Sequence, residues 1–220
     1  MRDPGAAAEL SGEVDLIERA ISYALGNLRE VTSAALIRPT PCREWDLRAL
    51  LRHMDDSLIA LQEASDLGHV ALGPVPCQAD PAANLVAVLR ARACRLLGAW
   101  AGAARDAARG PAPDAARGAA PDTAQEMLRA GSVSVGGLPA PVELVAWAGA
   151  VEVTVHGWDV GQACGAARPI PAQLAGELLW RLPQIVTAAD RPTRFAEPVP
   201  VPAGASAADR LLAFLGRQPG

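Results

Sequence analysis

The chain has 220 residues, of which 50% are hydrophobic and 20% charged, and its formal net charge is −4 at pH 7. That length suits one hydrophobic core with a short appendage, so we expect a single domain over residues 1–220, with a core at about 10–165 and a C-terminal extension at about 166–220. The scattered basic residues argue against nucleic-acid binding, and because no apolar run or signal peptide is evident, we expect a cytoplasmic protein without a membrane partner.

The first half of the chain reads as amphipathic helices. Apolar residues at steps of three and four predict a long helix from residue 10 to about 37. The proline-containing segment 38–45 is expected to be a loop, after which Asp46 can cap a second helix with its core stripe at residues 47–61. A loop over residues 68–76 contains His69 and precedes a third helix.

The third helix is expected to open at Asp80 and Pro81, an N-cap followed by a first-turn proline, and to fade near Arg105. The proline-containing stretch 107–122 is low in complexity and predicts an irregular connection. A short extended piece is expected at residues 133–137.

Pro141 is expected to start a long helix that runs to about Cys164. Within it, residues 151–156 alternate like a strand, but the flanking apolar residues keep a helical period, so we interpret the whole stretch as helix. A further helix is predicted at about 171–187, and a last one begins at Ser206 with a capping box to Asp209. Together the elements predict an all-α fold, an antiparallel four-helix bundle with a short C-terminal helical extension.

Two of the three histidines fall on the predicted bundle helices and form a candidate metal site with one glutamate. Glu152 and His156 lie four positions apart and therefore share one face of a helix. His53 borders the apolar stripe of its helix and should point into the bundle. If the two helices face each other, the set suits zinc, nickel or iron(II) and leaves coordination positions open. The alternative is an ordinary hydrogen-bonded Glu152–His156 pair and a satisfied core histidine at position 53.

Three segments give the chain a resemblance to a known family: TPCREWDLRALLRH at 40–53, EVTVHGWDV at 152–160, and a tail with VPVP at 199–202 and DRLLAFLGR at 209–217. With them the chain resembles the DinB/YfiT-like superfamily of metal-binding four-helix bundles, and specifically the actinobacterial branch related to mycothiol-dependent maleylpyruvate isomerase (N-terminal-domain type). The resemblance implies a divalent metal ion, with zinc expected first and nickel or iron next, held by His53, Glu152 and His156. It also implies mycothiol as a cosubstrate.

The function implied by this resemblance is a mycothiol-dependent transferase or isomerase acting on an electrophilic metabolite. A metal-dependent hydrolase, cyclase or lyase of specialised metabolism is the alternative enzyme, and a non-catalytic metal or small-molecule binding protein is the third interpretation. The expected partner is a small-molecule substrate and not a nucleic acid. A homodimer is the assembly to consider, since bundles with an exposed apolar face often dimerise.

Two acidic residues and two other side chains have open roles. Asp56 lies three residues after His53. It is either a general acid/base or supporting carboxylate beside the metal, or an exposed helix carboxylate. Asp159, three residues after His156, has the same two interpretations. His69 is expected to be solvated. Cys42 is a weak candidate nucleophile because its only basic neighbour along the chain is Arg43.

Overall fold

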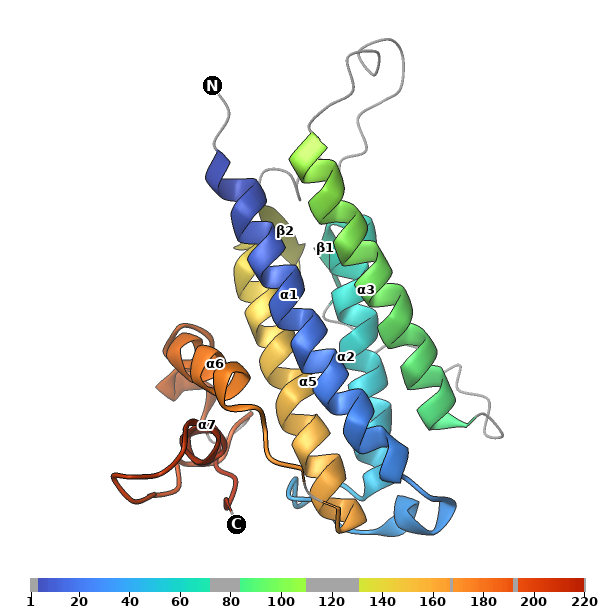
Figure 1. Cartoon of the computed structure of the whole chain (residues 1–220), viewed down its shortest axis with the longest axis vertical. Coiled ribbons are helices and arrows are strands. Elements are labelled where there is room, and N and C mark those ends of the chain that lie inside the picture. The colour runs from blue at the N-terminus through green and yellow to red at the C-terminus, as the bar shows by residue number, and fades with distance from the viewer. Residues whose placement is uncertain (1–3, 72–83, 110–130, 167, 192–193, 220) are drawn as a thin grey trace. The chain divides into compact units, whose positions relative to one another are not determined.

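The computed structural model describes residues 4–71, 84–109, 131–166, 168–191 and 194–219 (Figure 1). These residues form six α-helices, three 3-10 turns and one three-stranded sheet. The prediction of a mostly helical chain is confirmed, and the small sheet is an addition that the all-α expectation did not include. The helices are α1 (Pro4–Asn27), α2 (Leu47–Leu67), α3 (Leu85–Arg109), α5 (Val142–Cys164), α6 (Ala172–Ile185) and α7 (Ala207–Phe214).

The first helix is shorter than predicted, because α1 ends at Asn27 and two 3-10 turns, Leu28–Glu30 and Ser33–Ile37, follow it. Thr32 has an extended backbone, and its side chain accepts a hydrogen bond from the backbone N–H of Ala35, which caps a separate turn. Thr32 thus offers the backbone a local alternative to the helix. Ile37 is 76% exposed, so it does not continue the buried stripe of α1.

The second helix starts as predicted, since Asp46 Oδ1 accepts a hydrogen bond from the backbone N–H of Ala49 at 2.8 Å. For α3 the cap is Asn84, whose Oδ1 accepts from the N–H groups of Val86 and Ala87. The predicted Asp80–Pro81 start lies outside the described residues. The third helix continues to Arg109, beyond the expected end near Arg105, and the rest of the expected connection, from residue 110, is outside the described part of the chain.

The sheet consists of β1 (His69–Val70), β2 (Ser132–Val135) and β3 (Leu138–Pro141). β1 pairs with β2 in parallel, and β2 with β3 in antiparallel register. His69 therefore lies in a strand and not in the expected loop. The extended piece predicted at 133–137 is confirmed for residues 133–135, which belong to β2, whereas residues 136 and 137 form the turn that leads to β3. α5 begins one residue later than expected, at Val142, because Pro141 ends β3.

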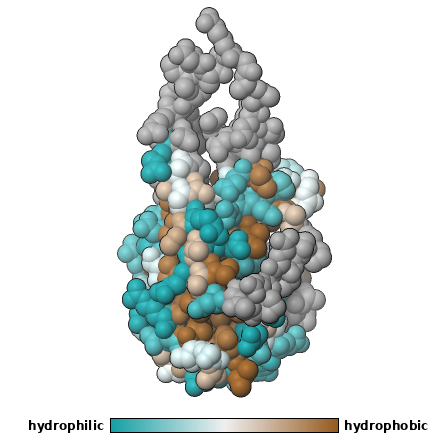
Figure 2. Space-filling model, turned by 90° about the vertical axis from the view of Figure 1, so that its right-hand side faces the viewer, coloured by the Kyte–Doolittle hydropathy of each residue, from teal (hydrophilic) through white to brown (hydrophobic). Residues whose placement is uncertain are grey.

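The chain clusters into two compact units, and α1, α2 and α5 each contribute residues to both. The first unit comprises residues 1–18 and 54–149. In it, Asp55 of α2 forms an ion pair with Arg92 of α3 at 2.5 Å, and the indole N–H of Trp100 donates to the backbone carbonyl of Leu61. Figure 2, viewed from the side of α3, shows hydrophilic and hydrophobic residues exposed beside one another.

The second unit comprises residues 19–53 and 150–220. In its core, α1 approaches α5 so closely that a Cβ added at Gly157 would lie 2.9 Å from Ala24 Cα. α6 is joined to α1 by the Arg19–Glu177 ion pair, at 2.5 Å, and α6 and α7 pack against each other (Figure 1).

The later helix predictions are confirmed within this unit. Residues 151–156 are helical as part of α5, which ends at Cys164 as expected. α6 ends at Ile185, two residues before the predicted 187. Ser206 and Asp209 form the predicted capping box of α7. Among the described helices, none combines the length and apolar character needed to cross a membrane.

Candidate metal centre

The three predicted metal ligands all belong to the second unit and lie together. His53 comes from α2, and Glu152 and His156 come from successive turns of α5. Glu152 Oε1 is in hydrogen-bond contact with His53 Nε2 and lies 3.2 Å from His156 Nε2. One ligand atom from each residue lies within 4.8 Å of the others.

The three side chains of the cluster differ in their exposure to solvent. The side chains of His53 and Glu152 are 36% and 29% exposed, whereas that of His156 is only 8% exposed. The loop before α2 places an aromatic ring next to the more exposed histidine: the Trp45 ring centroid lies 4.5 Å from that of His53. Thr40 holds this loop, donating its hydroxyl hydrogen to the backbone carbonyl of Trp45 at 2.9 Å. Trp45 therefore packs against a candidate ligand and limits its ring orientation.

In the buried part of the cluster, Asp159 is the hydrogen-bond partner of His156. Asp159 has no exposed surface, and its Oδ2 lies 2.9 Å from His156 Nδ1. When Nδ1–H donates to this carboxylate, the neutral ring keeps its Nε2 lone pair on the side of Glu152. Of the two interpretations of Asp159, the exposed helix carboxylate is therefore wrong.

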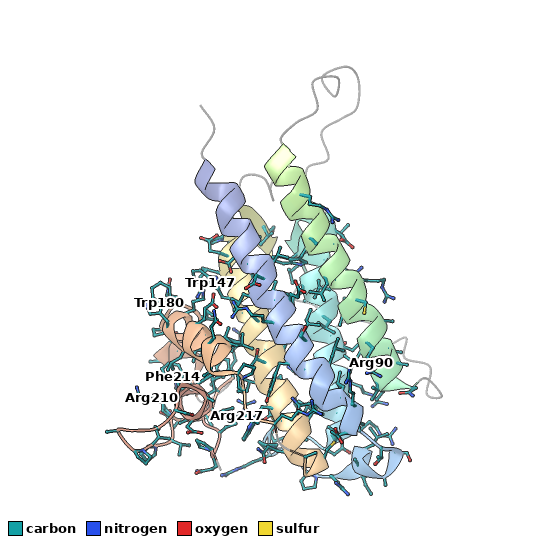
Figure 3. All side chains as sticks on the ribbon, viewed as in Figure 1. Arg90, Trp147, Trp180, Arg210, Phe214 and Arg217 are labelled. Carbon is teal, nitrogen blue, oxygen red and sulfur yellow. The ribbon has the colours of Figure 1, made fainter. Side chains whose placement is uncertain are left out.

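Arg217 and Cys42 complete the surroundings of Asp159 (Figure 3 labels Arg217). Arg217 donates from Nη2 to Asp159 Oδ2 at 2.9 Å and to Cys42 Sγ at 3.1 Å. The Cys42 thiol lies 3.4 Å from Asp159 Oδ2 and 3.9 Å from His156 Nδ1. Sequence reasoning missed Arg217, which follows Asp159 by 58 positions and appeared only at the end of the tail motif. Cys42 thus has a second basic neighbour that its sequence context did not reveal.

The charged forms of Glu152, His156 and Asp159 stabilise one another, which shifts the pKa of each group. Burial favours a neutral carboxyl at Glu152, but the charge and hydrogen bond of His156, together with those of His53, hold the pKa of Glu152 well below its ordinary value. Burial likewise opposes a charged His156, yet Glu152 and Asp159 raise the pKa of His156 well above its ordinary value. The pKa of Asp159 is lowered against the effect of burial by His156 and Arg217.

The donor set fits a divalent cation. It offers two imidazole nitrogens and one carboxylate oxygen, which is the ligand chemistry of zinc and of other first-row metals. The hydrogen bond from Nδ1 to a buried carboxylate is the usual support of a metal-binding histidine. The same geometry without a cation is a carboxylate hydrogen-bonded to two histidines, the alternative that the sequence left open.

A family model described as the mycothiol maleylpyruvate isomerase N-terminal domain matches residues 18–161. The chain belongs to this DinB-like family. No curated protein and no solved structure matches the chain.

The part of the chain that matches the mycothiol maleylpyruvate isomerase family model includes His53, Glu152, His156 and Asp159, but it ends before Arg217. Asp56, the predicted general acid/base, also lies within the match and is exposed on α2. His69 is exposed on β1, as expected for a solvated side chain.

Proposed function

We propose that the protein is a metal-dependent enzyme that uses mycothiol to transform an electrophilic small molecule, as a transferase or an isomerase. The convergence of His53 Nε2, Glu152 Oε1 and His156 Nε2 carries this proposal, because these atoms can serve together as ligands of one cation. Zinc is the metal we favour, and nickel and iron suit the same donors. Membership of the family supports the thiol and, as part of the same proposal, a DinB-like four-helix bundle in one domain.

His53, Glu152 and His156 would hold the cation. When bound, the cation supplies Lewis acidity that lowers the pKa of a thiol or water molecule reaching its open side. The exposure of His53 and Glu152 gives a small molecule access to this side. Asp159 keeps the buried His156 ring in the tautomer that presents Nε2.

In the proposed reaction, the thiol adds to an activated carbon–carbon double bond: its proton leaves, a carbon–sulfur bond forms and the π bond breaks, and in the stable adduct the neighbouring carbon takes up a proton. A stable adduct makes the protein a transferase, whereas later loss of the same thiol after bond rotation makes it an isomerase. Asp56 is our candidate for the proton carrier, since it is an exposed carboxylate on α2 about one helical turn from His53.

Metal analysis followed by a thiol-dependence assay tests the proposal. Plasma mass spectrometry should find about one zinc, nickel or iron ion per chain in the native protein, because a site with three protein ligands holds one metal ion. His156→Ala should lose the metal, whereas His69→Ala, which removes an exposed histidine of β1, should retain it. Turnover of electrophiles such as maleylpyruvate or monobromobimane is then measured with mycothiol, with cysteine and without thiol.

Metal-dependent turnover that requires mycothiol would support the proposal. Metal-dependent turnover that needs no thiol would contradict it in favour of a hydrolase or lyase. Native protein that lacks metal and cannot be reconstituted would refute it at its first step.

A further inference from the structure

We infer that Arg217, in the C-terminal segment beyond the family match, is a positioning residue of the candidate metal centre. The inference rests on the proposed metal site and assigns part of its support to the tail of the chain. Arg217 acts through Asp159, which in turn orients the ligand His156.

The contacts form a continuous chain from the tail to a ligand atom. Arg217 Nη2 and Nε reach Asp159 Oδ2 and Oδ1, at 2.9 and 3.4 Å, so the guanidinium spans both oxygens of the carboxylate. Such a two-point contact fixes the plane of the carboxylate as well as its position. The same Oδ2 lies 2.9 Å from His156 Nδ1, and the opposite ring nitrogen faces Glu152.

The burial of the pair shows that it is more than a surface ion pair. The side chain of Asp159 is fully buried and that of Arg217 is only 12% exposed. Removing one member of a buried pair leaves the other charge without its compensating partner. Replacement of Arg217 should therefore disturb Asp159, and through it the ring of His156.

The backbone of the tail is shaped to deliver Arg217 to this position. Gly216 has a φ of 77°, and its N–H donates to the carbonyl of Ala213, while the N–H of Arg217 donates to the carbonyl of Leu212. These are the two hydrogen bonds of a Schellman motif at the end of α7. A Cβ at Gly216 would also lie 2.6 Å from Ala196 Cβ, so the turn needs glycine for both conformation and space.

The end of α7 is itself held in place. Arg191 donates from Nη2 to the backbone carbonyl of Phe214 at 2.6 Å, and its guanidinium lies 5.0 Å from the centre of the Phe214 ring. Tyr23 of α1 donates its hydroxyl hydrogen to the carbonyl of Arg168, which ties the start of the tail to the same unit. The segment from residue 168 to Arg217 is thus anchored near both of its ends.

Zinc affinity, measured by competition with a chromophoric chelator, tests the inference. Arg217→Met should weaken zinc binding by about tenfold, the lower end of the usual effect of an outer-sphere partner. The zinc affinity of Arg217→Lys should lie between those of Arg217→Met and the wild type, because an ammonium group cannot span both carboxylate oxygens as a guanidinium does. The matched control is Arg210→Met, which removes an exposed arginine of α7 that donates to Ala203 and should leave zinc affinity unchanged.

A double-mutant cycle separates positioning from a general loss of structure. If Arg217 acts through Asp159, then Arg217→Met should weaken zinc binding less than about threefold in an Asp159→Asn background, because linked residues are not additive. Additive effects would overturn the inference, and so would wild-type zinc affinity in both Arg217 variants. Melting of the metal-free protein shows whether Arg217→Met folds. If it does not, Arg217→Lys replaces it, and the inference is then overturned by wild-type zinc affinity in Arg217→Lys or by additivity with Asp159→Asn.

The two proposals fail differently. Wild-type protein that binds no zinc would refute the proposed metal site and the inference with it. Wild-type protein that binds zinc, loses it in His156→Ala and keeps full affinity in the Arg217 variants would overturn the inference alone.

Discussion

Gly157, the residue after His156, gives a direct test of the packing that positions the candidate centre. A methyl group at this position would lie 2.9 Å from Ala24 Cα and 3.0 Å from Ala24 Cβ. Both are main-chain or first side-chain atoms, so neither can rotate away. Because ordinary contacts begin at 3.4 Å, Gly157→Ala requires α1 and α5 to separate locally by about 0.5 Å.

The expected effect is a balance of two terms. Overpacking of this kind costs about 1–3 kcal/mol, and replacing a helical glycine by alanine gains about 1 kcal/mol. Gly157→Ala should therefore lower the free energy of unfolding by up to about 2 kcal/mol, or about 2–4 °C in Tm per kcal/mol for a chain of this size. Where α5 takes up part of this displacement, Glu152 and His156 move relative to His53 of α2. Metal–ligand distances tolerate only about 0.2 Å, so zinc affinity should also fall.

Gly98 is the matched control, because it lies in α3 and nothing stands within 4 Å of an added Cβ. Gly98→Ala should stabilise the protein by about 1 kcal/mol through helix propensity alone and leave zinc affinity unchanged. Urea unfolding and chelator competition on both variants give the comparison. If Gly157→Ala stabilised the protein as much as Gly98→Ala, the close approach of α1 to α5 would be refuted.

Four further predictions concern protons and helix α2. The raised pKa of His156 means that zinc must displace a proton at pH 7, so affinity should fall as the pH falls; calorimetry in two buffers should detect the released proton, and its absence would contradict the assigned charge. In metal-free protein the stability due to His156 is fully present below its unfolded pKa of about 6.5 and is lost as the pH rises through its higher folded pKa, so melting with chelator should show a decline above neutrality that His156→Ala removes. Asp46→Ala should cost about 1 kcal/mol by removing the cap of α2, with Glu44→Ala in the same loop as the control, and equal melting curves would show that the cap contributes nothing. Asp56→Asn should reduce turnover and leave metal content intact, and unchanged kinetics would remove Asp56 from the mechanism.

Local patterns predicted the helices best. The start of α2 follows from a cap residue and a 3.6-residue apolar period, and the valine-rich stretch 151–156 becomes helix because the same period continues on its N-terminal side. The end of α1 was missed for a local reason of another kind. Apolar residues continue past Asn27, but the Thr32 side chain caps a new turn that periodicity alone does not reveal.

The place of β1 in the sheet could not be predicted from the sequence because its partner strand is distant. β1 has two residues, His69 and Val70, and its partner strand begins at Ser132. A two-residue strand shows no alternation, and parallel pairing depends on tertiary structure and not on a turn signal. β3 begins only three positions after β2 ends, and it was missed for a different reason, since its two prolines are unusual within a strand.

In the candidate centre, too, only some of the contacts could be predicted from the sequence, as the two nitrogens of His156 show. Its Nε2 faces Glu152, one helical turn away, so the spacing of two residues in α5 was sufficient to predict that contact. Its Nδ1 faces Asp159, also on α5, whose two roles the sequence left open. The burial of Asp159 and its contact with His156 decide between them, and Asp159 is held in turn by the buried Arg217 of the tail. The orientation of His156 thus depends on a residue outside the family match, and this is why metal affinity in the Arg217 variants tests the fold and the site together.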